Sequence, residues 1–322
     1  MKAIQIDGDR LVWADAPSPS PGPGEIRIDV HATAVNRADL VQRAGGYPPP
    51  PGASEILGLE CAGTVSEVGE GVTRVSPGQA VCALLAGGGY AEQVVVPAGQ
   101  VLPIPAGLDF HQAAALPEVF ATAYLNLFME AGLEKGERVL IHAGASGVGT
   151  AAIQLCRAFH NPCFVTAGGD EKIARCVALG AEGGFDRHDG DFQEAVRSWA
   201  GERGVDVILD VVGAAYFAQN VACLGLRGRL LLVGLMGGVQ TDVNLGMLMM
   251  KRLRVIGSTL RARPVAEKAR VMDALWSRVW PLFGDGSVKP VIEAVMPVQD
   301  AEEAHRLVES NETVGKVVLA VR

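Results

Sequence analysis

The stretch that decides the fold is Val139-Leu140-Ile141-His142-Ala143-Gly144-Ala145-Ser146-Gly147-Val148-Gly149. An apolar run leads into a glycine-rich turn, and a helical pattern follows the turn. Gly144 permits a tight exit from the strand, and Gly147 beside the small Ser146 lets a ligand approach the backbone. Gly149 lets the helix pack closely on the strand. The helix N-terminus presents N–H groups and a positive dipole end, so the turn predicts a dinucleotide site.

The turn departs from the pattern G-x-G-x-x-G, because Ser146 stands at the place of the second glycine. A serine on a strand-to-helix turn is also typical of hydrolase nucleophiles. That elbow, however, needs a glycine two residues later, where Val148 stands. A strand–helix turn that binds no ligand is the remaining alternative. We favour dinucleotide binding because the surrounding sequence alternates strands with helices.

This alternation extends over residues 119–262. The predicted strands are Glu137–Ala143, Cys163–Ala167, Val205–Val212, Gly228–Gly234 and Arg254–Ser258. The predicted helices are Val148–Phe159, Asp170–Leu179 closed by Gly180, one near Phe192–Ala200, and one that runs into Leu224. Strands that alternate with helices of this length are typical of βαβ units and a parallel sheet. We therefore predict a Rossmann dinucleotide-binding domain in an α/β protein.

The two ends of the chain predict a second domain. Residues 1–118 contain short strands bounded by Gly, Pro or Ser, namely Glu25–His31, Gly63–Val68, Ala80–Leu85 and Tyr90–Val96. Their spacing favours an antiparallel barrel or sandwich. Residues 263–322 are expected to return to this domain with helices Pro264–Phe283 and Gln299–Glu309 and strand Gly315–Val321. Two domains suit 322 residues, because single cores stop growing at about 250–300 residues.

The composition excludes several kinds of partner. The net charge is −8 without a basic stripe, so no nucleic acid is expected. We see no signal-peptide core and no long uncharged apolar stretch, so we expect no membrane association and a cytoplasmic location. The six cysteines, scattered without a CxxC pair, are predicted to be buried thiols in a reducing compartment: Cys61, Cys82, Cys156, Cys163, Cys176 and Cys223.

The end of the second parallel strand bears on which nicotinamide cofactor binds. NAD-binding domains place Asp or Glu there to hold both ribose hydroxyls, whereas this strand ends in Thr166-Ala167-Gly168-Gly169. Asp170 lies near the expected distance, but we interpret it as the N-cap of the next helix. Lys172 and Arg187 are the nearby cations that would meet a 2′-phosphate. The sequence therefore favours NADP(H).

Other polar residues receive structural interpretations. The histidines are isolated and lack zinc spacing, and His142 is predicted to be a core histidine with satisfied hydrogen bonds. Asp210 is expected to have a structural role in the loop after its strand. The segment Tyr47-Pro48-Pro49-Pro50-Pro51-Gly52 is interpreted as a stiff loop that shapes a pocket, with a polyproline ligand for an SH3-type domain as the alternative.

Motifs of a known family occur along the whole chain. They are Asn36–Asp39, Gly58–Glu60, Gly69–Val72 with Pro77-Gly78, Ala113–Pro117, the turn at 144–149, Gly228–Leu230, Gly257–Arg261 and Gly315–Val318. With them the chain resembles the zinc-independent quinone oxidoreductases of the medium-chain dehydrogenase/reductase superfamily. The p53-inducible quinone oxidoreductase group is resembled most, over Asn36–Leu40, Pro48–Leu59, Ile141–Leu155 and Gly234–Gly238.

The resemblance implies a GroES-like β-barrel catalytic domain from both chain ends, a Rossmann domain between them, and the cofactor in the intervening cleft. Zinc-using relatives have cysteine and histidine where this chain has Asn36 and Leu59, and their third ligand falls on Glu118, so no catalytic metal is expected. The family's 2′-phosphate lysine falls on Lys172. Two departures are Gly169, where a serine is common, and Arg187, where a tyrosine lies near the adenine.

The implied reaction is hydride transfer from NADPH to a quinone or a polarised enone. Asn36 and Tyr47 would border the acceptor, without a histidine or carboxylate beside it, and Thr122 would lie near the nicotinamide. The cofactor would contact Thr122, Gly144, Ser146, Gly147, Val148, Gly149, Gly168, Lys172, Arg187, Gly234, Leu235, Leu260 and Lys316. The alternatives are a reductase of enone or enoyl double bonds and a crystallin-like NADPH-binding protein of low turnover.

Assembly is predicted from the segment Val233–Ser258, which carries Met236 and the methionines of Met247–Met250. Apolar sequence at the edge of a sheet needs cover, which a second copy provides across a two-fold axis. We therefore expect a homodimer, as the resemblance also implies. The alternative is that these methionines pack inside the monomer.

Overall fold

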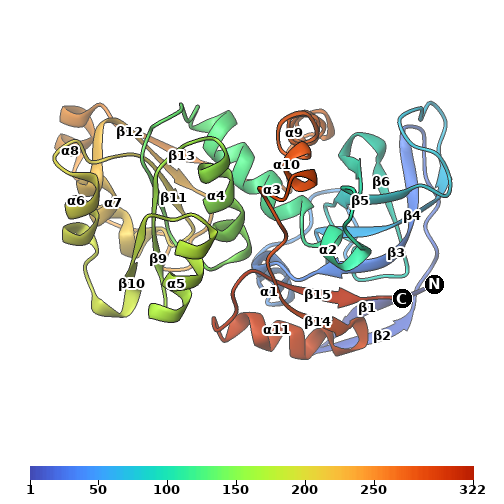
Figure 1. The fold of residues 1–322 in the computed structure, drawn as a ribbon. Coiled ribbons are helices and arrows are strands. Elements are labelled where there is room, and N and C mark those ends of the chain that lie inside the picture. Colours follow the sequence, from blue (N-terminus) through green and yellow to red (C-terminus); the bar gives the residue numbers. More distant parts are fainter. The chain divides into compact units, whose positions relative to one another are not determined.

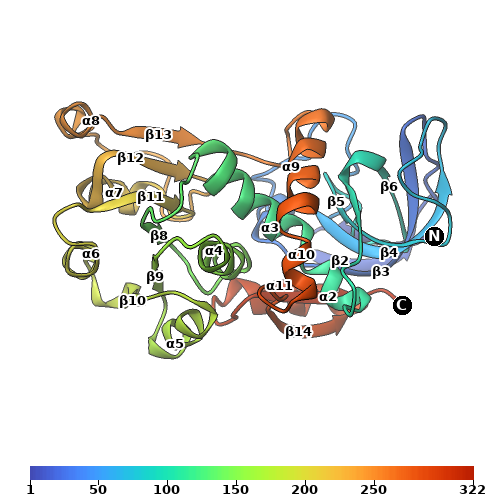
Figure 2. The same cartoon turned by 45° about the horizontal axis from the view of Figure 1, so that its top comes forward.

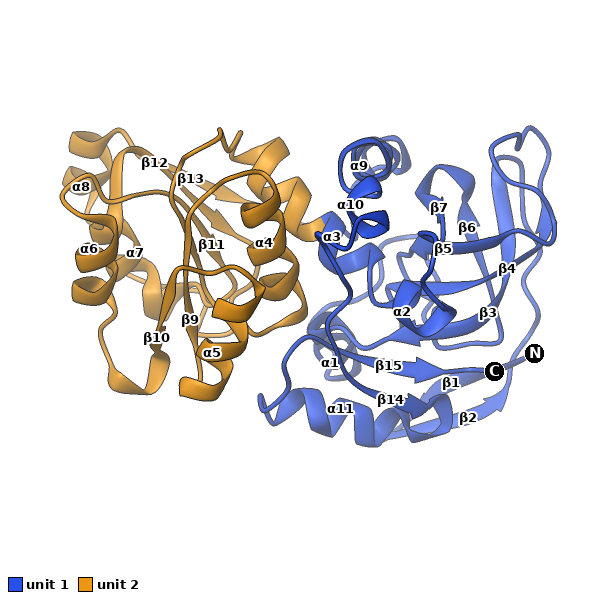
Figure 3. Ribbon diagram, viewed as in Figure 1, with its two compact units in different colours: residues 1–121, 260–322 blue, residues 122–259 orange.

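The computed structural model describes residues 1–322, which divide into two compact units (Figure 3). Unit 1 contains Met1–Ala121 and Leu260–Arg322, and unit 2 contains Thr122–Thr259. The sequence-based limits were residues 118 and 262. Each unit has its own sheet and its own hydrophobic core, so each is described separately.

Unit 1 is built around a mixed sheet in the order β14-β15-β3-β4-β5-β7, with β6 paired to β3. The strands are β3 (Glu25–Ala34), β4 (Glu60–Val68), β5 (Ala80–Leu84), β6 (Gln93–Pro97), β7 (Val101–Pro103), β14 (Ile292–Pro297) and β15 (Lys316–Ala320). Alternate residues of β3 are buried, including Ile26, Ile28 and Val30, and pack in one core. β15 pairs antiparallel with β3, so the C-terminal strand extends the sheet formed by the N-terminal residues.

The remaining elements of unit 1 flank this sheet (Figure 1). They are the hairpin β1 (Lys2–Asp7) and β2 (Arg10–Asp15), the helices α1 (Arg37–Arg43), α2 (Phe110–Ala114), α9 (Val265–Arg278), α10 (Pro281–Gly284) and α11 (Ala301–Glu309), and the 3₁₀ turns η1 (Ala98–Gln100) and η5 (Val298–Asp300). The prediction of one helix over Pro264–Phe283 is wrong. The helix ends at Arg278 and a new one starts at Pro281, since proline lacks the N–H that a continuing helix needs.

Unit 2 contains a parallel sheet in the order β10-β9-β8-β11-β12-β13. Its strands are β8 (Val139–Ile141), β9 (Cys163–Ala167), β10 (Gly183–Asp186), β11 (Val205–Asp210), β12 (Leu224–Leu232) and β13 (Arg254–Gly257). Its helices are α4 (Gly147–Ala158), α5 (Asp170–Leu179), α6 (Gln193–Ala200), α7 (Phe217–Cys223) and α8 (Leu245–Lys251), with 3₁₀ turns η3 (Arg187–Asp189) and η4 (Ala214–Tyr216). Helix α3 (Pro117–Tyr124) runs into the π-helix η2 (Leu125–Glu130) and enters this unit.

The strand order reverses between β8 and β11. The chain proceeds outward from β8 to β9 and β10, and then returns to add β11 on the other side of β8. Helices α4 and α5 cover one face of the sheet, and α6 and α7 cover the other (Figures 1 and 2). In doubly wound sheets a ligand binds at the carboxyl ends of the strands beside such a reversal. The glycine-rich turn Gly144–Gly149 follows β8 at this point.

Three further predictions can be compared with the structure. All six cysteines are buried and free, as expected. Asp170 is the first residue of α5 and Gly169 is the N-cap, so the N-cap interpretation of Asp170 is wrong by one position. Gly169 has φ +92°, which a glycine adopts without strain. None of the helices has the length and apolar character that crossing a membrane requires.

Candidate functional site

The turn after β8 is held by glycine packing and by a serine cap. A Cβ on Gly144 would lie 2.6 Å from Val165 Cβ, and one on Gly149 would lie 2.4 Å from the carbonyl oxygen of Ala143. Ser146 is the N-cap of α4, and its Oγ accepts the N–H of Gly149 at 3.0 Å. The first N–H groups of a helix have no partner within it. The cap uses one of them, which leaves those of Gly147 and Val148 to face an anionic ligand.

Four buried polar side chains form a hydrogen-bonded series beside this turn. His142 Nδ1 is 2.9 Å from Thr166 Oγ1, and its Nε2 is 2.7 Å from Asn220 Oδ1. Asn220 Nδ2 in turn donates to Asp210 Oδ2 at 3.0 Å. Since the amide nitrogen of Asn220 faces the carboxylate, its oxygen accepts from His142 Nε2, and Thr166 donates to Nδ1. Burial lowers the pKa of His142 to about 4, so the imidazole is neutral at pH 7.

Asp210 connects this series of hydrogen bonds to the loops after β11 and β12. It accepts the N–H groups of Val212 at 2.6 Å and Gly213 at 3.1 Å, and burial raises its pKa to about 6. The structural roles predicted for His142 and Asp210 are confirmed. The loop after β11 also accepts the N–H groups of Met236 and Gly237, which fixes the segment that contains Gly234 and Leu235. This one series of hydrogen bonds therefore orders three loops at the carboxyl edge of the sheet.

The exit from β9 has no side chain where NAD-binding domains carry a carboxylate. A Cβ built on Gly168 would lie 3.2 Å from Arg187 Nε and 3.3 Å from His188 Nε2. Arg187 was predicted from the sequence, whereas the adjacent His188 was not. Lys172 lies in the first turn of α5. Thr122 lies on α3, where its carbonyl oxygen accepts from Asn126 Nδ2 at 2.8 Å.

In unit 1, Asn36 belongs to a closed ionic network. Its Nδ2 donates to Glu60 Oε1 at 2.9 Å and to the carbonyl oxygen of Ala34 at 3.3 Å, and its Oδ1 accepts from Lys316 Nζ at 2.7 Å. Lys316 also lies 2.7 Å from Glu60 Oε1 and donates to the carbonyl oxygen of Val35 at 2.7 Å. Both amide hydrogens of Asn36 and all three ammonium hydrogens of Lys316 are thus used within the chain.

This network corrects one expectation. No carboxylate was expected beside the acceptor residues, but Glu60 is fully buried and hydrogen-bonded to Asn36. The pairing of Glu60 with Lys316 joins two strands far apart in the sequence, and no local pattern reveals it. Asn36 can donate to an acceptor only by giving up an existing bond, so its geometry favours a role in orienting the site.

Tyr47 is the other candidate and has a different environment. Its hydroxyl makes no hydrogen bond within the chain, whereas its carbonyl oxygen accepts from Arg261 Nη1 at 3.2 Å. The Arg261 guanidinium lies 5.3 Å from the Tyr47 ring centroid, and also bonds the carbonyl oxygen of Ala86 and Gln42 Oε1, each at 2.7 Å. Burial and the Glu118 carboxylate raise the Tyr47 pKa, and Arg261 opposes them. Arg261 thus fixes the proline loop; its neighbour Leu260 is buried.

Two of the three residues that the sequence resemblance places at zinc positions, Asn36 and Leu59, do not suit zinc. The Asn36 amide is occupied as described, and Leu59 is apolar and buried. Thiolate, imidazole and carboxylate are the side chains that bind zinc in proteins. No group of three or more His, Cys, Asp or Glu side chains is arranged to hold a metal ion.

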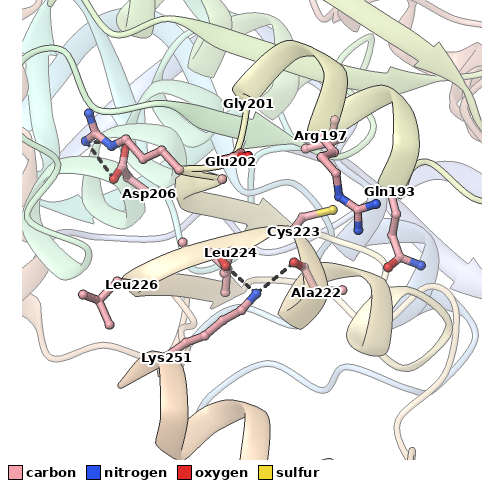
Figure 4. A pocket seen from close by; sticks show the side chains of 14 residues that line it. Gln193, Arg197, Gly201, Glu202, Asp206, Ala222, Cys223, Leu224, Leu226 and Lys251 are labelled. Atoms are coloured by element: carbon pink, nitrogen blue, oxygen red, sulfur yellow. Dashed lines mark hydrogen bonds and ion pairs between the residues drawn. The ribbon is translucent and has the colours of Figure 1, made fainter.

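A cavity of about 650 Å³ lies elsewhere in unit 2, beside the amino ends of β11 and β12 (Figure 4). Two of the three cations that line it, Lys251 and Arg203, already have partners. Lys251 Nζ donates to the carbonyl oxygens of Val221, Ala222 and Leu224, and Arg203 pairs with Asp206. Burial raises the pKa of its cysteine, Cys223, to about 12, so the thiol is not a nucleophile. This cavity is at the opposite edge of the sheet from the candidate site, and we assign it no catalytic role.

Two family models match the chain. Residues 22–106 match the alcohol dehydrogenase GroES-like domain, and residues 147–277 match the zinc-binding dehydrogenase domain. The quinone oxidoreductase of Rattus norvegicus is 31% identical over 297 residues, which cover 92% of this chain and 88% of the relative. The highly-reducing polyketide synthase 1 of Aureobasidium melanogenum is 33% identical over 97% of this chain, but the chain spans only 14% of that protein's length.

Solved structures give the same result. A quinone oxidoreductase of Escherichia coli complexed with NADPH is 29% identical with a TM-score of 0.86, over 99% of this chain and 98% of that one. An NAD-dependent alcohol dehydrogenase is 31% identical with a TM-score of 0.87 over the whole of both chains. The chain therefore belongs to the medium-chain dehydrogenase/reductase superfamily, with a GroES-like domain and a Rossmann domain as predicted. It is an oxidoreductase with quinone oxidoreductases among its relatives.

Proposed function

We propose that the protein is a zinc-independent NADPH:quinone oxidoreductase. The observation that carries this proposal is the contrast between Tyr47 and Asn36, the two residues that were predicted from the sequence to border the acceptor. The Tyr47 hydroxyl is available to an acceptor, while Asn36 is bound into a network with Glu60 and Lys316 where zinc-using relatives hold their metal. The site thus offers a neutral hydrogen-bond donor and no Lewis acid. Quinones suit such a site, because the hydroquinone anion formed on reduction is already delocalised.

The cofactor that fits unit 2 is NADP(H). Gly147 and Val148 would hold the pyrophosphate, and Gly168, Lys172 and Arg187 would surround the 2′-phosphate. When bound, NADPH supplies a hydride from its nicotinamide ring. The alcohol dehydrogenase named above uses NAD, so family membership alone does not decide the cofactor. The decision here rests on Gly168, where the chain presents Arg187 and His188 in place of a carboxylate.

In this proposal each residue of unit 1 has a distinct part. Tyr47 donates a hydrogen bond to the acceptor oxygen, and Arg261 holds the Tyr47 backbone and lies against its ring. Asn36 contributes its fixed amide, oriented by Glu60 and Lys316. Holding donor and acceptor atoms together can supply about 7–11 kcal/mol of the barrier, so orientation accounts for most of the rate.

A reductase of enone or enoyl double bonds is the second candidate. The observation that favours it is the 33% identity to part of a highly-reducing polyketide synthase. Both candidates need the same hydride donor, so the turn after β8 serves either. A crystallin-like protein of low turnover would bind NADPH at the same turn and oxidise it slowly.

A substrate panel separates these candidates. Purified protein would be mixed with NADPH and a series of ortho-quinones, para-quinones, enones and enoyl thioesters, and NADPH oxidation would be followed by absorbance. Gly147→Leu, which places a side chain against the pyrophosphate, provides the matched blank. We expect turnover to be greatest with a quinone and absent in Gly147→Leu. Greater turnover with enones supports the second candidate, and binding without oxidation supports the crystallin-like role.

We also propose a cytoplasmic homodimer. β13 is an edge strand of the unit 2 sheet, and next to it in sequence Met249 and Met250 are 72% and 74% exposed. Met247 and Leu248 pack partly against the unit 2 core, so only half of this helix is accounted for within the monomer. Pairing of the exposed side chains across a two-fold axis would cover them.

A further inference from the structure

The exit of β9 presents an imidazole that the proposed function does not yet use. Gly168 has no side chain, and the space above it is bordered by Arg187 Nε and His188 Nε2, at 3.2 and 3.3 Å from the position of a Cβ. In Rossmann domains this is where the adenosine ribose lies and where 2′-hydroxyl and 2′-phosphate are distinguished. An arginine there is a familiar solution, whereas a histidine adds a group that changes charge near neutral pH.

Local hydrogen bonds fix where His188 stands. Asp186, at the end of β10, accepts the N–H of His188 at 3.0 Å and also accepts the N–H of Gly169, and these bonds lower its pKa. The Asp186 carboxylate is therefore engaged by the backbone and is not presented to a ribose. Arg187 Nε lies 3.5 Å from His188 Nε2, so the two side chains stand together beside Gly168.

We propose that His188 is a specificity-determining residue that becomes protonated when NADPH binds and then donates Nε2–H to the 2′-phosphate. This inference rests on the proposed cofactor. When NADPH binds, the neutral imidazole takes up one proton from solvent and forms an imidazolium–phosphate pair. Arg187 Nε then turns from His188 to the phosphate. NADH has no 2′-phosphate and gains nothing from this proton. A phosphate dianion favours the charged form of an imidazole within hydrogen-bond reach.

The charges around His188 leave room for this change. On its own turn His188 has the cation Arg187 and the carboxylate Asp189 as sequence neighbours, and the Asp186 carboxylate of β10 lies close by. The first turn of α5, which packs beside β10, carries Asp170, Glu171 and Lys172. Gly168, which follows β9, borders the ring. The positive and negative charges around His188 therefore offset each other. A bound phosphate dianion adds negative charge and favours the imidazolium.

The test is the pH dependence of cofactor affinity in two variants. Dissociation constants of NADPH and NADH would be measured by nicotinamide fluorescence between pH 6 and 8.5 for the wild type, His188→Asn and the control His160→Asn. His160 is an exposed histidine beyond α4. The 2′-phosphate of free NADPH titrates near pH 6, and this contribution of the free ligand is common to all three proteins and cancels in the ratio of their constants.

We expect His188→Asn to bind NADPH about as tightly as the wild type at pH 8.5 and about tenfold more weakly at pH 6, the scale of a charged hydrogen bond. NADH affinity and the control should not change. Calorimetry in two buffers of different ionisation enthalpy should show proton uptake by the wild type and not by His188→Asn. A pH-independent ratio, or an equal loss for NADH, overturns the role of His188. A wild type that binds neither cofactor overturns the proposed function together with this inference.

Discussion

Replacement of Tyr47 by phenylalanine separates orientation from acid catalysis. The Tyr47 hydroxyl has no partner within the chain, so its removal orphans no polar group and should leave folding stability nearly unchanged. Burial and Glu118 raise the Tyr47 pKa, which makes the phenol a weaker acid than usual while it remains able to donate a hydrogen bond. A neutral hydrogen bond contributes about 0.5–1.5 kcal/mol, which corresponds to about two- to tenfold in rate. General acid catalysis contributes about 10²–10⁴-fold.

The assay is single-turnover oxidation of bound NADPH by a saturating quinone, with NADPH affinity measured separately. We expect Tyr47→Phe to retain wild-type NADPH affinity and to react no more than about tenfold slower, the scale of one hydrogen bond. Gln42→Leu is a useful companion, because it removes the acceptor of Arg261 Nη2 without touching the hydroxyl. If Tyr47→Phe binds NADPH normally but reacts a thousandfold slower, orientation is not the main effect and Tyr47 is the proton donor.

Four other predictions follow from named residues. Lys172→Ala should weaken NADPH binding by about 1–3 kcal/mol and spare NADH, as titration of both cofactors would reveal; equal losses would mean that Lys172 does not contact the 2′-phosphate. Quinone reduction should survive exhaustive chelation, since Asn36 and Leu59 cannot replace zinc ligands; stoichiometric zinc lost together with activity contradicts this. Light scattering at micromolar concentration should give the mass of a homodimer, and a monomer would refute the edge-pairing argument. Burial raises the Asp39 pKa to about 6, so the folded state binds this proton more tightly than the unfolded state. The free energy of unfolding of the wild type, measured in urea, should therefore fall relative to that of Asp39→Asn as pH rises from 4 to 6. A rise over that range would contradict the raised pKa of Asp39.

Local signals in the sequence were sufficient for much of unit 2. The bounds of β9 and α5 agree with the predicted Cys163–Ala167 and Asp170–Leu179, because an apolar run and the closing Gly180 mark them clearly. The adjacent strand β10 escaped prediction. Its sequence begins Gly183-Gly184, which has low strand propensity, and it forms because the edge of β9 supplies its partner.

The polar site of unit 1 shows why other features could not be predicted. Glu60 and Lys316 form a buried ion pair at 2.7 Å, yet they come from opposite ends of the chain. Only the return of β15 to β3 brings them near each other, and that pairing depends on tertiary packing. Asn36 was identified through a family motif, but its exhausted hydrogen bonds are visible only in three dimensions. Sequence patterns gave candidate residues here, and geometry distinguished an orienting amide from an available hydroxyl.

The central claim is that this chain transfers hydride from NADPH to a quinone without metal. It is tested most directly by the quinone-dependent oxidation of NADPH, and of NADPH deuterated at the transferred position, by chelator-treated protein in a single turnover. The account predicts oxidation well above the non-enzymatic rate, slowed by deuterium, and absent when Gly147→Leu replaces the wild type. NADPH that stays reduced in the presence of quinones, or that is oxidised only after zinc is added, contradicts it.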